Sequence, residues 1–244
     1  MATHFARGIL NCGHLLPARL SPDCHAQARA LPAHLRARFL AARTLLAELI
    51  FMLYGTAELP DIVTRDGGKP EFTGSSQPRF SIAYAGNIVG VALSTVSECG
   101  LGMALQPATR RAPVDDSANI TPLSRAETLW IENQSDPEEA RTQMLALRQS
   151  VLKLGVSPER LQLLPGAGRL STAERAPVEA ICDAEDVLVW SVAASPAIER
   201  LKIWEFDSGS GWRGLPDISL RASEPSASLM RFTSLPGERT PILS

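Results

Sequence analysis

The strongest helical pattern in the chain lies at residues 35–54, where apolar residues recur at helical spacing and Gly55 follows as a typical helix end. Capping residues mark two further helix starts. Ser124 stands three residues before Glu127, which is the spacing of a capping box. Asp136 precedes a proline and two acids, which favour the first turn of a helix. The sequence therefore predicts one long helix in its first part and two helices further on.

Short apolar runs of strand length follow these helices. Residues 80–82 and 88–93 flank an Ala-Gly-Asn turn, and a third apolar run covers residues 101–105. Residues 186–193 and 201–206 have the same character later in the chain. Helical and strand signals in this arrangement indicate an α+β fold.

Two polar stretches suggest how the chain is divided. Residues 107–122 are rich in Pro, Ala, Thr, Asp and Arg, and they predict a linker between an N-terminal half (1–106) and a C-terminal half (123–218). The Ser- and Pro-rich residues 219–244 predict a polar tail that is partly disordered. Each half begins with a helix and contains a similar hydrophobic strand, which suggests that the two halves are related.

Composition narrows the functional class. The 244 residues are 45% hydrophobic and 20% charged, with a formal net charge of −2, which is ordinary for a soluble globular protein. This near-neutral balance gives no electrostatic reason to expect nucleic acid as a partner. No apolar run approaches the roughly 20 residues of a membrane helix. The four scattered cysteines suit free thiols in a reducing compartment. We therefore expect a cytoplasmic protein with neither nucleic acid nor membrane as its partner.

All four histidines lie before residue 35, together with two of the cysteines. Cys12 with His14, and Cys24 with His25, have the side chains of zinc ligands but not the spacing of a common zinc module. Prolines in this segment indicate an irregular loop. We expect these side chains to be solvated loop residues rather than a metal site.

A series of short motifs runs in order through residues 36–206. The motifs are Phe39–Leu46, Gly68-Lys69-Pro70, Phe80–Gly86, Gly100–Ala104, Ser124-x-x-Glu127 and Arg148-Gln149-Ser150-x-x-Lys153. Each is weak alone. In this order they resemble the 4'-phosphopantetheinyl transferases of the Sfp type, closest to the branch of holo-acyl-carrier-protein synthase and enterobactin synthase component D.

The resemblance implies an α+β fold of two similar halves related by pseudo-twofold symmetry, with coenzyme A (CoA) held between them. The family reaction moves 4'-phosphopantetheine from CoA to a serine of an acyl or peptidyl carrier protein, and it uses Mg²⁺. The residues that the resemblance places at CoA are Arg43, Lys69, Tyr84, Arg148 and Lys153.

Each of these five side chains also has a plain structural alternative. Arg43 and Lys153 could be solvated charges on helix faces, and Lys69 could belong to a turn. Tyr84 could point into a core, and Arg148 could pair with an acid at the start of its own helix.

The chain departs from the family pattern at its acids. The Asp and Glu of Gly-x-Asp-x-Glu are replaced by Gly102 and Ala104, and the Glu of Lys-Glu by Gln149. An amide binds metal poorly and cannot act as a base at neutral pH. Glu98 and Glu127 are nearby acids that could substitute as Mg²⁺ ligands. Their structural alternatives are a solvated loop acid and a helix-capping side chain.

We expect a transferase-like protein whose catalysis is impaired, and which binds CoA or a carrier protein as an accessory component. One alternative is an active holo-acyl-carrier-protein synthase with substitute Mg²⁺ ligands. The other is a pure interaction module of a fatty-acid or polyketide-like assembly, in contact with another synthase subunit. If the metal cleft survives, the triple variant Gly102→Asp, Ala104→Glu, Gln149→Glu should gain Mg²⁺ binding.

Overall fold

The fold is that of a computed structural model of the 244-residue chain. It describes residues 2–10, 15–64, 68–74, 77–106, 122–172, 176–216, 218 and 228–235. The predicted linker therefore lies almost wholly outside the described residues, as do Cys12 and His14. No helix in the described part of the chain is long and apolar enough to cross a membrane.

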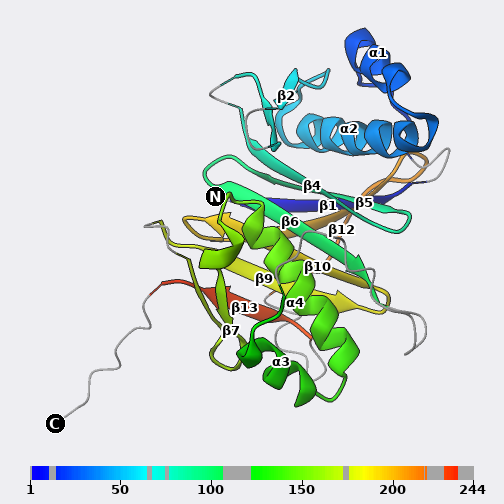
Figure 1. The fold of residues 1–244 in the computed structure, drawn as a ribbon. Coiled ribbons are helices and arrows are strands. Elements are labelled where there is room, and N and C mark those ends of the chain that lie inside the picture. Colours follow the sequence, from blue (N-terminus) through cyan, green and yellow to red (C-terminus); the bar gives the residue numbers. More distant parts are fainter. Residues whose placement is uncertain are drawn as a thin grey trace.

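Two β-sheets stack face to face, and a long helix covers the outer face of each (Figure 1). The five-stranded sheet has the order β12-β11-β1-β5-β4, with β1 Thr3–Ile9, β4 Arg79–Ala85, β5 Ile88–Ser94, β11 Leu201–Asp207 and β12 Gly211–Gly214. The six-stranded sheet has the order β6-β10-β9-β13-β8-β7, with β6 Glu98–Leu105, β7 Gln162–Leu164, β8 Arg169–Ser171, β9 Glu179–Glu185, β10 Leu188–Ser195 and β13 Met230–Thr233. A small sheet pairs β2 Ile62–Thr64 with β3 Pro70–Phe72. The predicted α+β class is confirmed.

The helices are α1 Pro22–Ala30, α2 Ala33–Tyr54, α3 Arg125–Glu132 and α4 Pro137–Leu152, with short 3-10 turns at Pro158–Arg160 and Pro165–Ala167. All the helix predictions are confirmed with their caps. Gly55 ends α2 with a φ of 71°, in the left-handed region that glycine adopts without strain. Ser124 and Glu127 form the capping box of α3, and the Asp136 side chain accepts hydrogen bonds at the start of α4.

The irregular loop expected from the prolines before residue 35 is confirmed for residues 15–21, which form neither helix nor strand. It is wrong for Cys24 and His25, which lie in helix α1, and for the residues of the central strand β1. His4 is buried in β1, where its Nδ1 accepts a hydrogen bond from Trp204 Nε1 at 3.1 Å, and burial lowers its pKa to about 4. The polar residues of β1 hid the strand because their partners lie about 200 positions away in the sequence.

The same order of elements occurs twice along the chain. A long helix, a short strand pair, a long hairpin and a further strand follow one another as α2, β2–β3, β4–β5, β6, and again as α4, β7–β8, β9–β10, β11. The last strand of each series joins the other sheet, since β6 pairs with β10 and β11 pairs with β1. The two parts of the chain are thus interlocked by exchanged strands.

The C-terminal segment also contributes to a sheet. β13 pairs with β9 through the register Met230 to Cys182, so the expectation of a polar tail is wrong for residues 230–233. Phe232 in this strand is 1% exposed and packs in the core beneath α4.

The core between the sheets depends on β1. Phe5 is fully buried there, and its ring lies 5.2 Å from that of Trp190 in the opposite sheet. We predict that Phe5→Ala lowers the free energy of unfolding by about 3–5 kcal/mol, because it opens a cavity between the sheets. Phe51→Ala, at a residue that is 39% exposed, should cost less than about 1 kcal/mol. Urea denaturation of both variants checks this, and equal losses would contradict the central position of β1.

Candidate functional site

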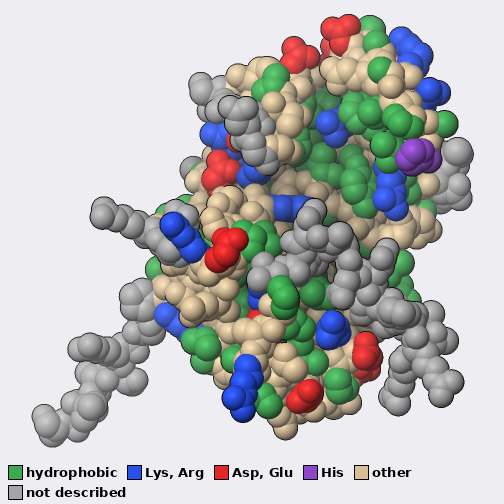
Figure 2. Space-filling view, in the orientation of Figure 1, with side chains coloured by type: hydrophobic (Ala, Val, Ile, Leu, Met, Phe, Trp, Pro, Cys, Tyr) green, Lys and Arg blue, Asp and Glu red, His purple; other side chains and the backbone are tan. Residues whose placement is uncertain are grey.

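Several of the residues singled out by the motifs lie along one side of the stacked sheets, where an edge strand of each sheet approaches the other. β4 and β6 are edge strands of their sheets, and they approach each other between α2 and α4 (Figure 1). The backbone N–H of Leu101 in β6 donates to Ser81 Oγ in β4 at 3.0 Å. We call this line of contact, with the side chains of α2 and α4 that border it, the β4–β6 seam. On the face drawn in Figure 2, several Lys and Arg side chains lie across the middle of the molecule beside hydrophobic ones.

Lys153 spans the seam from the C-terminal end of α4. Its ammonium donates to the carbonyl of Ile82 in β4 at 2.8 Å and to that of Leu101 in β6 at 2.7 Å. Burial lowers the pKa of Lys153 to about 8. The alternative of a fully solvated helix charge is therefore wrong, because the side chain joins one strand of each sheet.

Arg43 and Tyr84 lie together at the α2 side of the seam. The guanidinium of Arg43 stacks at 4.2 Å from the ring of Phe39, and burial lowers its pKa although Tyr84 and Cys24 act in the opposite direction. Burial raises the pKa of Tyr84, and the nearby arginines partly offset this. Tyr84 is half-buried: its ring packs against the edge of the core beneath α2, and its hydroxyl donates to the Arg38 carbonyl at 3.1 Å.

The positive charge in this part of the seam is not balanced by acids. Among the described residues, neither Arg38 nor Arg43 forms a salt bridge, and Lys153 bonds only backbone carbonyls. Arg38 also lies above the ring of Tyr84, 5.5 Å from its centroid. Cations without carboxylate partners are suited to an anionic ligand.

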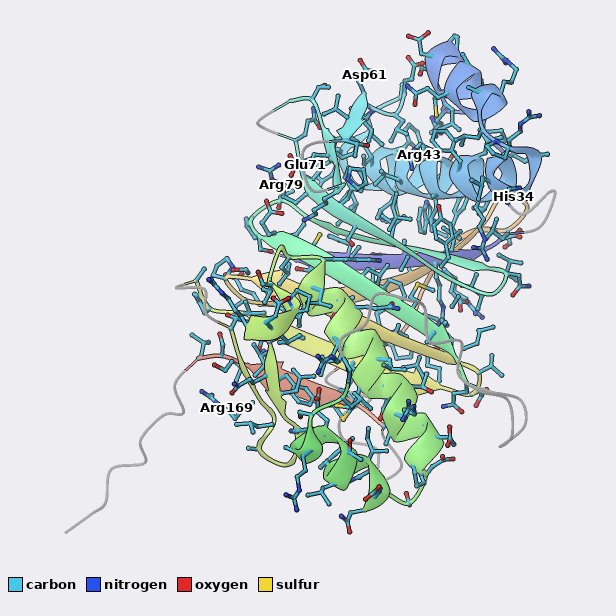
Figure 3. All side chains as sticks on the ribbon, in the orientation of Figure 1. His34, Arg43, Asp61, Glu71, Arg79 and Arg169 are labelled. Carbon is cyan, nitrogen blue, oxygen red and sulfur yellow. The ribbon has the colours of Figure 1, made fainter. Side chains whose placement is uncertain are left out.

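Lys69 lies at the other end of β4, within a chain of alternating charges. Its ammonium bonds Glu98 Oε2 at 2.8 Å, and Glu98 Oε1 takes Arg79 Nε at 3.0 Å. Arg79 in turn pairs with Glu71 at 3.4 Å, and Figure 3 shows these two side by side at this end of the strand. Both carboxylate oxygens of Glu98 are thus held by cations, an arrangement that does not favour metal binding. Lys69 has its charge neutralised in the same contact.

Arg148 and Glu127 form a buried ion pair. Arg148 Nη1 donates to both carboxylate oxygens of Glu127, at 2.7 and 2.9 Å, and the two side chains are 3% and 0% exposed. Glu127 also accepts from the Ser124 N–H in the capping box. This burial corrects two expectations: Arg148 cannot reach a CoA molecule in solvent, and Glu127 is a cap and counter-ion rather than a substitute metal ligand. The partner of Arg148 is on α3 and not at the start of its own helix.

Positions 102 and 149, where the family pattern has acids, lie next to each other where β6 passes beneath α4. A Cβ built on Gly102 would lie 2.0 Å from the Ala146 carbonyl oxygen and 3.1 Å from Gln149 Cβ, and one built on Gly100 would lie 1.9 Å from the Ser150 carbonyl oxygen. The strand and helix backbones are therefore in direct contact. Positions 102 and 149 are neighbours, but the space for a side chain at 102 is filled by the helix itself.

The donor set does not fit Mg²⁺. Gly102 and Ala104 offer no side-chain oxygen, and Gln149 offers one neutral amide. Within the described ranges, no group of three or more His, Cys, Asp or Glu residues could hold a metal ion. Restored acids would recreate the site only if strand and helix moved apart at Gly102, because a side chain there overlaps the Ala146 carbonyl of α4.

Sequence reasoning missed Arg38 and Arg79 as members of the seam. Arg38 contacts Tyr84 and the Gly86 carbonyl at the end of β4, and no local pattern reveals these contacts. Arg79 begins β4 and pairs with acids from two other strands.

Comparison with known proteins gives two relatives. The chain is 56% identical over 240 residues to the uncharacterised protein YieE of Escherichia coli strain K12, covering 96% of both chains. Identity and coverage are the same for YieE of Escherichia coli O6:H1 strain CFT073. No protein-family model matches the sequence.

Substitution of Gly102 tests the contact between β6 and α4. We predict that Gly102→Ala lowers the free energy of unfolding by about 1–3 kcal/mol, since even one methyl group overlaps the Ala146 carbonyl. Gly102→Asp should cost more than about 4 kcal/mol and create no Mg²⁺ binding. Ala104→Asp, two residues along the same strand at a half-buried position, is the matched control and should cost less. Wild-type melting of Gly102→Asp would contradict the packing.

Lys153 should make stability depend on pH. The folded protein releases the proton near pH 8, whereas the unfolded chain keeps it to about pH 10.5, so the unfolded state binds more protons in this window. The free energy of unfolding should therefore rise with pH between 8 and 10.5, by about 3 kcal/mol at most, and this term should be constant below pH 8. Lys153→Met should lack this rise in urea titrations. Identical pH profiles for the two proteins would show that the lysine is not desolvated.

Proposed function

The chain belongs to the YieE family, and we propose that it is a phosphopantetheinyl-transferase-like protein that binds CoA at the β4–β6 seam without transferring phosphopantetheine. In this proposal the protein binds CoA as the transferases do but does not catalyse the transfer, and it acts as an accessory component. Its partner would be an acyl or peptidyl carrier protein, or another synthase subunit.

The repeated order of elements supports the proposed fold. Two similar halves related by pseudo-twofold symmetry require the same elements in the same order. Each of the two series has a helix, a short strand pair, a hairpin and a strand that joins the other sheet. The seam then lies between the first series and the helix of the second, where the proposal puts the ligand.

The observation that carries the proposal is a set of cations along the seam that are not paired with a carboxylate in the described part of the chain. Arg38 and Arg43 of α2 lie beside Tyr84, and Lys153 at the end of α4 bonds the carbonyls of Ile82 and Leu101. Guanidinium and ammonium groups hold phosphate through charge-assisted hydrogen bonds that need no metal. CoA is a phosphate-rich ligand, which matches cations that have no carboxylate partner.

The lack of catalysis follows from the residues beneath α4. Transfer of a phosphoryl group needs cationic stabilisation of the transition state and a base for the attacking serine. Gln149 cannot act as a base, and Gly102 leaves no space for a metal-binding acid. The alternative of an active enzyme with Glu98 and Glu127 as ligands is disfavoured, because both carboxylates are held by cations.

Calorimetry with CoA tests binding. We expect micromolar affinity that is the same in EDTA and in Mg²⁺, since the proposed contacts involve only protein cations. Arg43→Glu should weaken binding at least about tenfold by reversing one of these charges. Arg160→Glu, an equal charge change at an exposed position of the first 3-10 turn, is the control and should bind like wild type.

Mass spectrometry of apo carrier proteins incubated with the protein, CoA and Mg²⁺ tests the second part of the proposal. No carrier protein should gain a phosphopantetheine arm. Conversion by catalytic amounts of the protein would establish an active transferase. Absence of CoA binding, with retained binding of a carrier protein, would instead favour the pure interaction module.

A further inference from the structure

Lysine is rare in this chain, and one of its lysines differs from the others in its partners. Of the 24 basic residues, three are lysines: Lys69, Lys153 and Lys202. Lys69 is paired with Glu98, whereas Lys153 bonds backbone carbonyls and has no carboxylate partner in the described part of the chain. An arginine at this place could also donate hydrogen bonds, but it cannot lose its proton. A lysine at position 153 therefore offers something that an arginine would not, which is a neutral amine.

Packing and two hydrogen bonds hold this amine in one place. A Cβ built on Gly100 would lie 3.2 Å from Lys153 Cβ, so the stem of the lysine lies directly on β6. The nitrogen donates to the carbonyls of Ile82 and Leu101 at 2.8 and 2.7 Å. A neutral amine has two N–H groups, both used by these carbonyls, and its lone pair is then directed away from them. Because the side chain is half-buried and not sealed in the core, a small reagent can approach the lone pair.

The neutral form of Lys153 is populated near neutral pH. Burial lowers the pKa of Lys153 from 10.5 to about 8. At pH 8 about half of these side chains are therefore neutral amines, compared with less than about 1% for an ordinary lysine. Desolvation of this kind is one of the ways in which lysines become nucleophiles in proteins.

No charge on the two strands that Lys153 joins is available to neutralise it. The charged or titratable side chains of β4 and β6 are Arg79, Tyr84, Glu98 and Cys99. Glu98 is held by Lys69 and by Arg79. Burial raises the pKa of Cys99 to about 12 and also raises that of Tyr84, so both side chains are neutral at pH 8. The amine thus stands apart from the ion pairs of the seam.

Cations on α2 favour an anionic reagent at this amine. Arg38 and Arg43 lie beside Tyr84, and neither has a carboxylate partner in the part of the chain that the structure describes (Figure 3). Tyr84 follows Ile82 by two residues, which is about 7 Å along the strand. Unpaired positive charge at this distance raises the local concentration of anions. An acyl donor that is itself negatively charged is therefore drawn toward Lys153.

We propose that Lys153 is a site of N-acylation by small acyl phosphates. The neutral amine attacks the carbonyl carbon, so that a nitrogen–carbon bond forms while the bond between this carbon and the phosphate oxygen breaks. The phosphate leaves with the electron pair of that bond and takes up the proton that the nitrogen loses. The product has one N–H and no charge, so it can no longer bond the carbonyls of both sheets. This reaction goes beyond the proposed function and does not depend on CoA binding.

Acetyl phosphate and the full-length protein test this proposal without CoA, with acetylation of each lysine followed by peptide mass spectrometry. At pH 8 Lys153 should react about five- to tenfold faster than Lys69 and Lys202, because its larger share of neutral amine outweighs its lower basicity and its burial. The rate at Lys153 should level off above about pH 8.5, whereas an ordinary lysine gains neutral amine up to about pH 10.5. Equal rates at the three lysines, parallel pH profiles, or an unmodified Lys153 would overturn the proposal.

A charge variant and a second acyl donor test the preference for anions. Arg43→Gln should slow acetylation of Lys153 by acetyl phosphate about two- to threefold, because it removes one attracting charge. Acetylation by 4-nitrophenyl acetate, which is neutral, should be unchanged in this variant. Arg160→Gln, at an exposed position of the first 3-10 turn, is the matched control and should change neither rate. Equal effects of Arg43→Gln on both donors, or no effect on either, would refute the assignment of an anionic acyl donor.

Discussion

The direct contact of β6 with α4 is the constraint on which the rest of this structure depends. Gly100 and Gly102 lie against the Ser150 and Ala146 carbonyls, so the helix rests on the strand without intervening side chains. This short separation brings the end of α4 to the edge of the six-stranded sheet. From there Lys153 reaches across to β4 and joins the two sheets at their edges. The packing that forms the seam thus also removes the space in which a metal-binding acid would stand.

Unpaired cations and ion-paired side chains occupy separate parts of the molecule. The α2 side of the seam holds cations without carboxylates, while its far end holds the alternating chain from Lys69 to Glu71. Beyond β1 the arginines are paired as well, Arg7 with Glu185 and Glu205, and Arg213 with Glu205. A near-neutral total charge conceals this separation, which is why composition alone gave no indication of a ligand.

Local signals could be predicted from the sequence, and long-range ones could not. The caps at Gly55, Ser124 and Asp136 were predicted because a cap involves only neighbouring residues. β1 was missed, since the partner of His4 is a tryptophan of β11. β9 was missed for the same reason: Glu179 is satisfied by Arg231 and by the Ile198 N–H, and its polarity disguised a buried strand. The exchange of β6 and β11 between sheets likewise has no local signature.

The candidate site, too, could be predicted from the sequence only in part. Motif order correctly suggested that positions 102 and 149 belong together, and the structure makes them neighbours. The approach of the α4 backbone, and the burial of Arg148 against Glu127 on a separate helix, depend on packing that no motif encodes. The glycines of β6 therefore have a structural explanation that their position in a degenerate motif did not reveal.

In the proposed function, the seam holds phosphate through protein cations alone. A crystal structure of the protein grown with CoA and Mg²⁺ tests it most directly. We expect phosphate oxygens of CoA within hydrogen-bond distance of Arg43 and Lys153, with no ion between β6 and α4. A six-coordinate ion at Gln149, or CoA bound away from the seam, would contradict it.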